Sequence, residues 1–108
     1  MEIIPVGDAH CDFLYYMVNR GYSFSEPPLS TQAVSLSGMR AGGAALQLFA
    51  AWIDPDSRIE PIQQCLTLID AYKRLLASCD AITPFGMGFS PTQGKIAAIL
   101  TVEGGEAV

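Results

Sequence analysis

The sequence contains few basic residues and no long apolar run, and each shortage argues against a class of function. Six Lys and Arg stand against eleven Asp and Glu, and the formal net charge is −5, which argues against a nucleic-acid interface. No apolar stretch approaches about 20 residues, the length that a membrane helix needs. The start also lacks the basic and apolar regions of a signal peptide. We therefore expect a cytoplasmic protein without membrane or nucleic-acid partners.

Cysteine is scarce as well, and the three cysteines form no C-x-x-C pair. An odd number is a poor disulfide framework, so Cys65 and Cys79 are expected to pack as small apolar residues. Hydrophobic residues, by contrast, make up 50% of the 108 residues, while charged residues make up 16%. This balance argues against disorder and predicts a single domain over residues 1–108.

Hydrophobic patterning predicts strands that alternate with helices. Apolar runs at residues 3–6, 44–52 and 95–102 are typical of strands buried in a parallel sheet. A first helix is expected after Asp12, which can cap it, and should end at Gly21. The order strand, helix, strand, helix, strand predicts an α/β fold with right-handed crossovers and a parallel sheet.

The second helix carries the clearest pattern in the chain. It follows Ser57-x-x-Glu60, which has the form of a capping box. Its expected buried face has apolar residues at spacings of three and four, namely Ile62, Leu66, Ile69, Tyr72, Leu76 and Cys79. Residues 22–34 read as a long irregular loop that could overhang a site, and residues 35–40 as a short helical turn. A turn-rich connection is marked by Pro84, Gly86, Gly88 and Pro91.

Candidate functional residues follow the predicted strands, where the carboxyl ends of parallel strands meet. His10 and Asp12 stand two residues apart, so both side chains leave the same face of an extended segment. Glu103 follows the third strand and can reach the same rim. An imidazole and two carboxylates suit a divalent ion such as zinc. The rim after the second strand carries Asp54 and Asp56.

In combination, these motifs resemble the opening of the membrane (renal) dipeptidase family, zinc metallopeptidases related to the amidohydrolases. The D-G-H-x-D motif of the family is matched by residues 8–12, with Ala9 in place of glycine. A Gly-Gly turn followed by A-x-Q-x-F/W is matched by residues 42–49. An Ile-Asp pair in a helix is matched by Ile69-Asp70, and E-G-G at a strand end by residues 103–105. Order and spacing agree along essentially the whole chain.

The resemblance implies a zinc-dependent hydrolysis of dipeptides. His10 and Asp12 would bind one zinc ion, and Glu103 would bridge it to a second. Such enzymes activate a bridging water as hydroxide, which attacks the dipeptide carbonyl while zinc holds the developing charge. The family also supplies two further zinc-binding histidines, substrate-binding residues and an acid/base group from later strands, whereas this sequence contains a single histidine.

The sequence departs from the family pattern in ways that limit this expectation. Glu106 stands where the family has histidine after E-G-G. A (β/α)₈ barrel of the TIM type needs about 250 residues, so three strands represent an incomplete barrel with two open edges. We expect little activity from the chain alone, and self-association through the open edges. The chain could equally be a fragment of a longer protein.

Two alternative functions stay open on the sequence alone. The first is another metal-dependent amidohydrolase that acts on a cyclic amide or lactone, although many of these enzymes open with His-x-His. The second is a non-catalytic α/β interaction module, in which the polar residues at the rim merely end the strands.

Overall fold

The computed structural model describes residues 4–86 and 94–107 as a single parallel sheet with helices. The elements follow in the order β1 (Val6–Cys11), α1 (Phe13–Arg20), α2 (Leu36–Ala41), β2 (Ala44–Trp52), α3 (Pro61–Ser78), β3 (Ile82–Pro84) and β4 (Ile96–Glu103). Strand order in the sheet is β1-β2-β4-β3, and every neighbouring pair is parallel. The predicted parallel α/β fold is thus confirmed.

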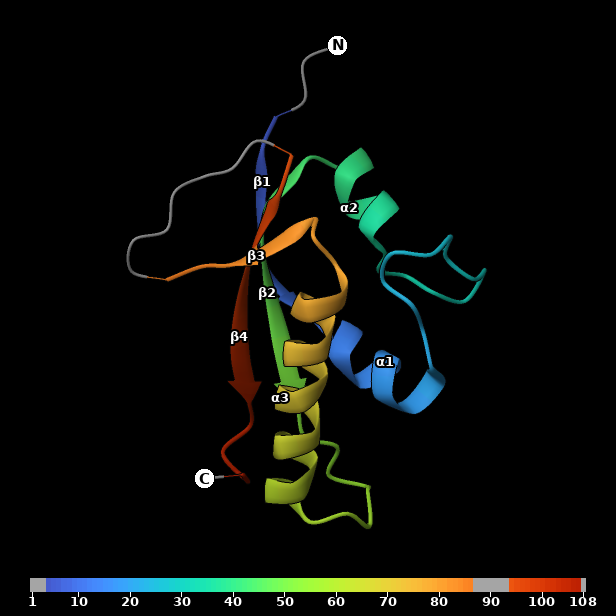
Figure 1. The fold of residues 1–108 in the computed structure, drawn as a ribbon. Coiled ribbons are helices and arrows are strands. Elements are labelled where there is room, and N and C mark those ends of the chain that lie inside the picture. The colour runs from blue at the N-terminus through green and yellow to red at the C-terminus, as the bar shows by residue number, and fades with distance from the viewer. Residues whose placement is uncertain (1–3, 87–93, 108) are drawn as a thin grey trace.

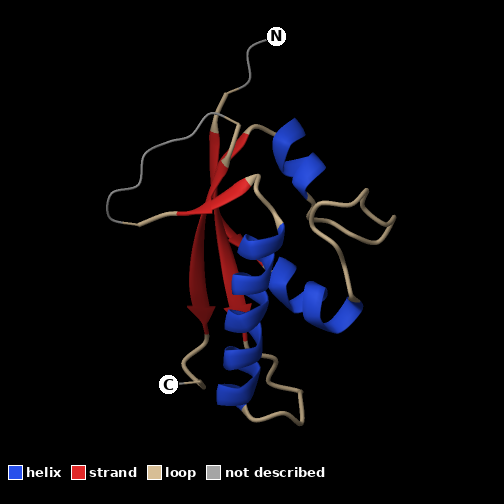
Figure 2. Cartoon of the chain, viewed as in Figure 1, coloured by secondary structure: helices blue, strands red, loops and turns tan. Residues whose placement is uncertain are grey.

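The helices form a layer on one face of the sheet. The steps from β1 to β2 and from β2 to β4 move in the same direction across the sheet, so right-handed crossovers place their helices on the same side. Figure 1 shows α1, α2 and α3 on one side of the strands, and each of the three contacts β2. The same two layers stand out when the chain is coloured by secondary structure (Figure 2).

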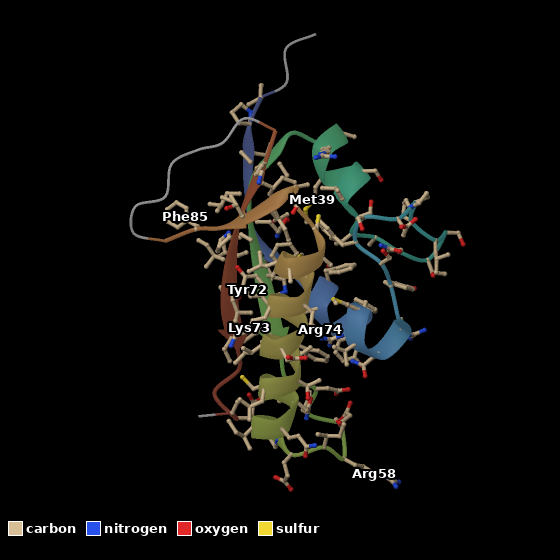
Figure 3. All side chains as sticks on the ribbon, viewed as in Figure 1. Met39, Arg58, Tyr72, Lys73, Arg74 and Phe85 are labelled. Carbon is tan, nitrogen blue, oxygen red and sulfur yellow. The ribbon has the colours of Figure 1, made fainter. Side chains whose placement is uncertain are left out.

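The core lies between this helix layer and the sheet, and aromatic rings form its centre. Phe49 of β2 is fully buried, and its ring lies 5.9 Å from Phe24 and 6.2 Å from Tyr72. Phe13, at the start of α1, meets Phe24 edge to face at 5.3 Å. Tyr72 belongs to α3 (Figure 3), so this cluster joins both long crossovers to the central strand. Such pairs add about 0.5–1.5 kcal/mol each beyond the burial of their area.

The face of α3 that packs on the sheet differs from the predicted stripe. Its buried residues are Cys65, Leu68, Ala71, Tyr72 and Leu75. Ile62 and Leu66, which were expected to be buried, are 54% and 59% exposed. Apolar residues run around more than half of this helix, so two adjacent faces satisfy the spacing rule. The position of the sheet decides between them, and the prediction for these two residues was wrong.

Three further expectations need correction. β1 covers Val6–Cys11 instead of residues 3–6, because polar residues are tolerated in a strand at the sheet edge; Ile3 lies outside the described residues. The turn-rich connection contains the short strand β3, while Gly88 and Pro91 also lie outside the described part. The predicted capping box does not form. Ser57 Oγ accepts from the Ile59 N–H at 3.1 Å, and α3 begins at Pro61, after Glu60.

The other helix ends agree with the sequence. α1 ends at Gly21, whose φ of 66° is the left-handed conformation that glycine adopts most easily. Asp12 precedes α1 as expected, but its side chain makes no capping hydrogen bond. Ser35 caps α2 by accepting from the Gly38 N–H at 3.1 Å. Within the described residues, no helix is long and apolar enough to cross a membrane.

Candidate metal centre

A shift in strand register positions His10 at the carboxyl end of β1. Asp8 pairs with Gln47 of β2, and Cys11 pairs with Phe49, so two residues of β1 lie opposite one residue of β2. The backbone N–H of His10 donates to Asp8 Oδ1 at 3.2 Å inside this irregular stretch. Cys11 packs into the core, so the preceding His10 points to the opposite face of the sheet. Simple alternation from Asp8 would have placed His10 on the helix side.

The three candidate ligands come together at one rim of the sheet. His10 Nε2 lies 3.2 Å from Asp12 Oδ1 and 3.5 Å from Glu103 Oε2. One potential ligand atom from each residue lies within 4.8 Å of those of the other two. The side chains remain 48%, 39% and 48% exposed. The expected convergence of these residues is therefore present, while their role as metal ligands stays a prediction.

The backbone holds the candidate ligands Asp12 and Glu103 from different parts of the fold. Asp12 lies at the junction of β1 and α1, and its carbonyl oxygen accepts from Tyr15 N–H at 3.1 Å. Glu103 ends β4 in register with Trp52, the last residue of β2. Gly104 follows with a φ of 89°, a conformation that turns the chain away from the strand and favours glycine. Hence the strand ends, and not the loops, determine where the ligands lie.

An unsatisfied atom in this group fits a cation. Asp12 Oδ1 is buried and has no hydrogen-bond partner among the described residues. His10 Nε2 is 3.2 Å away, but the contact does not meet hydrogen-bond geometry, so proximity alone does not satisfy the oxygen. Leaving a buried acceptor unpaired costs about 1–3 kcal/mol. One imidazole nitrogen and two carboxylate oxygens form a donor set that zinc accepts, and a cation would also offset the repulsion between the carboxylates.

Cys11 lies in the sequence between the candidate ligands His10 and Asp12 but belongs to the core. Its thiol is buried, and burial raises its pKa to about 11, with the carboxylates of Asp8 and Asp12 adding to the rise. A neutral thiol is a poor metal ligand because the thiolate is the form that binds metals. Cys65 and Cys79 are also buried and free, which confirms that they pack as apolar residues.

The rim after β2 holds a separate network that the sequence did not reveal. Asp54 does not join the metal group; its Oδ2 accepts from the Tyr15 hydroxyl at 3.5 Å. Gln64 of α3 accepts from the Asp54 N–H at 3.0 Å and donates to the Asp54 and Ile59 carbonyls at 3.3 and 2.8 Å. This glutamine ties the loop after β2 to the first turn of α3, and no local sequence signal marks it. Arg58 extends outward from the same loop (Figure 3).

Fold and rim together define the opening β/α units of a TIM-type barrel with a candidate metal group at the carboxyl ends of its strands. The model of the membrane dipeptidase family, peptidase family M19, matches residues 1–108, and the chain belongs to this family. A comparison with curated protein sequences finds no match.

The Ile69-Asp70 motif of α3 lies away from the candidate metal residues. Asp70 is exposed, and its Oδ2 accepts from Arg74 Nε at 2.9 Å.

Several solved structures are similar to the chain, and two of them are described here. One is described as dipeptidase AC, a metallo peptidase, with a TM-score of 0.68 and 24% identity. The other is a metallo peptidase from Rhodobacter sphaeroides liganded with a phosphinate mimic of the dipeptide L-Ala-D-Ala, with a TM-score of 0.75 and 19% identity. Each match covers 99% of this chain, which spans 37% and 40% of the two structures. The chain is thus an incomplete barrel, as its sequence predicts.

Proposed function

We propose that this chain supplies one part of the metal site of a zinc-dependent dipeptidase. The observation that carries the proposal is the convergence of His10, Asp12 and Glu103, whose ligand atoms lie within 4.8 Å of one another. Family membership supports a metallopeptidase activity. A dipeptide as substrate is supported by the similar structure that carries a phosphinate mimic of L-Ala-D-Ala.

In this proposal the three side chains hold zinc, which supplies polarisation of a carbonyl and activation of water at neutral pH. His10 offers a neutral nitrogen, so the charge of the ion is balanced by the two carboxylates. Asp12 is anchored at the first turn of α1 and presents its unpaired Oδ1. Glu103 ends β4, in register with Trp52 of β2, and in this proposal it would contact a second ion. The chain's contribution is therefore to position ligands.

The isolated chain is expected to have little or no hydrolytic activity. Three protein ligands suffice for one zinc ion with an open position, but a second ion would have too few. The resemblance assigns the remaining histidines to later strands, and this chain spans 37–40% of the similar structures. Purified chain with added zinc should hydrolyse L-Ala-D-Ala no faster than a His10→Ala variant. Substantial zinc-dependent hydrolysis by the wild type would contradict the assignment of a partial site.

Calorimetric titration with zinc tests the metal site directly. The wild type should bind about one ion, and His10→Ala or Glu103→Gln should each weaken binding by more than about tenfold. Glu26→Gln is the matched control, because Glu26 is an exposed glutamate in the loop 22–34 and should leave the affinity unchanged. Equal zinc binding by wild type and His10→Ala would instead favour a non-catalytic module.

We also propose that the chain self-associates through its sheet edges. β1 forms one edge, and all its residues except Cys11 are exposed. On the other side, β3 pairs with residues 96–98 of β4, so within the described residues the second half of β4 has no strand beside it at this edge, and its backbone groups there could pair with another chain. Light scattering should give a mass that exceeds 11.6 kDa and rises with concentration. A monomer at every concentration would refute this.

A further inference from the structure

An open cavity of about 320 Å³ lies between α2 and the β1 edge of the sheet, on the face that the helices cover. Its lining includes Asp8 of β1, Gln47 of β2, and Gly38 and Met39 of α2; Met39 is labelled in Figure 3. Asp8 and Gln47 are paired in register, so their side chains leave the same face of the sheet. Because His10 points to the opposite face, this cavity is separate from the candidate metal centre.

Gln47 brings an incompletely satisfied amide to the cavity. The residue is 2% exposed, and its Nε2 donates to the carbonyl of Leu48 at 3.0 Å. Its Oε1 accepts no hydrogen bond from the described residues. An amide oxygen that has lost its bulk water is costly to leave unpaired. An occupant of the cavity, whether water or a ligand, is therefore needed to donate a hydrogen bond to Gln47.

The charge of the lining is negative. Asp8 contributes a carboxylate, whose Oδ1 accepts from the His10 N–H at 3.2 Å and whose Oδ2 has no hydrogen-bond partner in the described part of the chain. The Oγ of Ser35, also in the lining, accepts from the Gly38 N–H at 3.1 Å. Within residues 4–86 and 94–107, no Lys or Arg lines this cavity. Its polar surface therefore favours a ligand that is positively charged and donates hydrogen bonds.

We propose that this cavity binds an organic cation, in which an ammonium or amidinium group is carried on an apolar body. The N–H groups of the cation donate to the carboxylate of Asp8 and to Gln47 Oε1, and the body lies against Val34 and Met39. A closed apolar cavity of about 150 Å³ holds a benzene molecule, so a space of about 320 Å³ has room for a ring and a cationic head group.

The ligand can enter from the edge of the sheet. Among the helices and strands of the described residues, β1 contacts β2 alone, and both Val6 and Asp8 in the lining are exposed. Binding needs no rearrangement of the core, and it needs no zinc, so the inference does not rest on the proposed metal site.

Three small probes of the same size test the chemistry of the cavity. Benzamidine is a cation, benzamide is its neutral counterpart and benzoate is an anion. Each is titrated into the full chain in the presence of a metal chelator, with ¹³C-labelled methionine methyl groups observed by nuclear magnetic resonance. The Met39 signal should shift with benzamidine, while Met17 of α1, which is not in the lining, should keep its position. Benzamidine should bind more than about fivefold tighter than benzamide, because one hydrogen-bond partner is then a charged pair, and benzoate should bind most weakly.

Two variants and one control assign the binding to the cavity. Asp8→Asn keeps an oxygen for the His10 N–H at an exposed position, so the fold should persist while the affinity for benzamidine falls to that for benzamide. Gln47→Met replaces the amide by an unbranched apolar chain of similar size and should also weaken benzamidine binding. Asp80→Asn removes an exposed carboxylate outside the lining and should leave the affinity unchanged.

The outcomes decide the inference independently of zinc binding. A Met39 shift with benzamidine that Asp8→Asn weakens and Asp80→Asn preserves would establish the site, even if calorimetry found no zinc bound. Equal affinities for benzamidine and benzamide, or equal effects of Asp8→Asn and Asp80→Asn, would overturn it. Absence of a Met39 shift at millimolar benzamidine would show that the cavity holds water only. If Gln47→Met does not fold, as judged by circular dichroism, the comparison of Asp8→Asn with Asp80→Asn still decides.

Discussion

The packing of α3 leads to a sharp prediction about two leucines of the same helix. Leu68 is 4% exposed and belongs to the core, whereas Leu66, two positions earlier, is 59% exposed. Truncation of a buried leucine to alanine loses its transfer free energy and leaves a cavity, at a cost of about 2–5 kcal/mol. Truncation at an exposed position is usually within about 0.5 kcal/mol, and alanine slightly favours the helix.

Urea denaturation followed by circular dichroism measures this difference. The denaturant dependence for a small domain is about 1–3 kcal/mol per molar urea, so a loss of about 2–5 kcal/mol in Leu68→Ala should lower the midpoint by at least about 0.7 M. Leu66→Ala should leave it nearly unchanged. The measurement needs a protein concentration at which all variants have the same association state. Equal shifts for the two variants, or a larger shift for Leu66→Ala, would contradict the burial of Leu68 and the exposure of Leu66.

Two other predictions concern the rim and the core. Trp52 is the only tryptophan and pairs with Glu103 in the sheet. Zinc binding at Glu103 should therefore change the tryptophan fluorescence of the wild type. The same fluorescence change in His10→Ala would contradict binding of the ion by His10. Burial raises the pKa of Tyr72, so the folded state disfavours its phenolate, and the free energy of unfolding should fall as the pH rises above about 10. Tyr72→Phe should lose part of this decline in denaturation series at alkaline pH, and an unchanged decline would show that Tyr72 does not cause it.

The sequence is sufficient to predict the alternation of strands and helices, because β2 and β4 are apolar runs of ordinary length that each follow a glycine. β3 was missed for a physical reason. It has three residues and ends at Pro84, so it has neither the length nor the pattern of a strand, and it forms only because the start of β4 offers free backbone groups. The first strand was predicted too far upstream, at residues 3–6 instead of Val6–Cys11, for a related reason. Its Asp8 and His10 are exposed at an edge, where a strand does not need an apolar pattern.

The metal group was predicted through its ligand types and their places after strands, but its geometry depends on the register of β1. The sequence places His10 and Asp12 two apart, which suggests alternation. Between the pairs Asp8–Gln47 and Cys11–Phe49, β1 has one residue more than β2. This irregularity determines which face of the sheet His10 lies on. Strand register depends on the partner strand, so it cannot be read from β1 alone. The contact of Gln64 with Asp54 is likewise a property of two distant segments.

The incomplete metal group and the open sheet edges have the same origin in the topology. β1, β2 and β4 are added in one direction with all helices on one face, an arrangement that covers its second face when the strands close into a barrel. In this sheet β1 is still an edge, and the rim beside Glu103 is still open. Among the described residues, β3 pairs with the first half of β4 alone, so a strand that pairs in parallel with the second half would bring its own carboxyl end beside Glu103, where the proposed metal site lacks a ligand. Whatever covers that edge, whether a second copy or another polypeptide, would therefore also supply the residues that complete the proposed metal site.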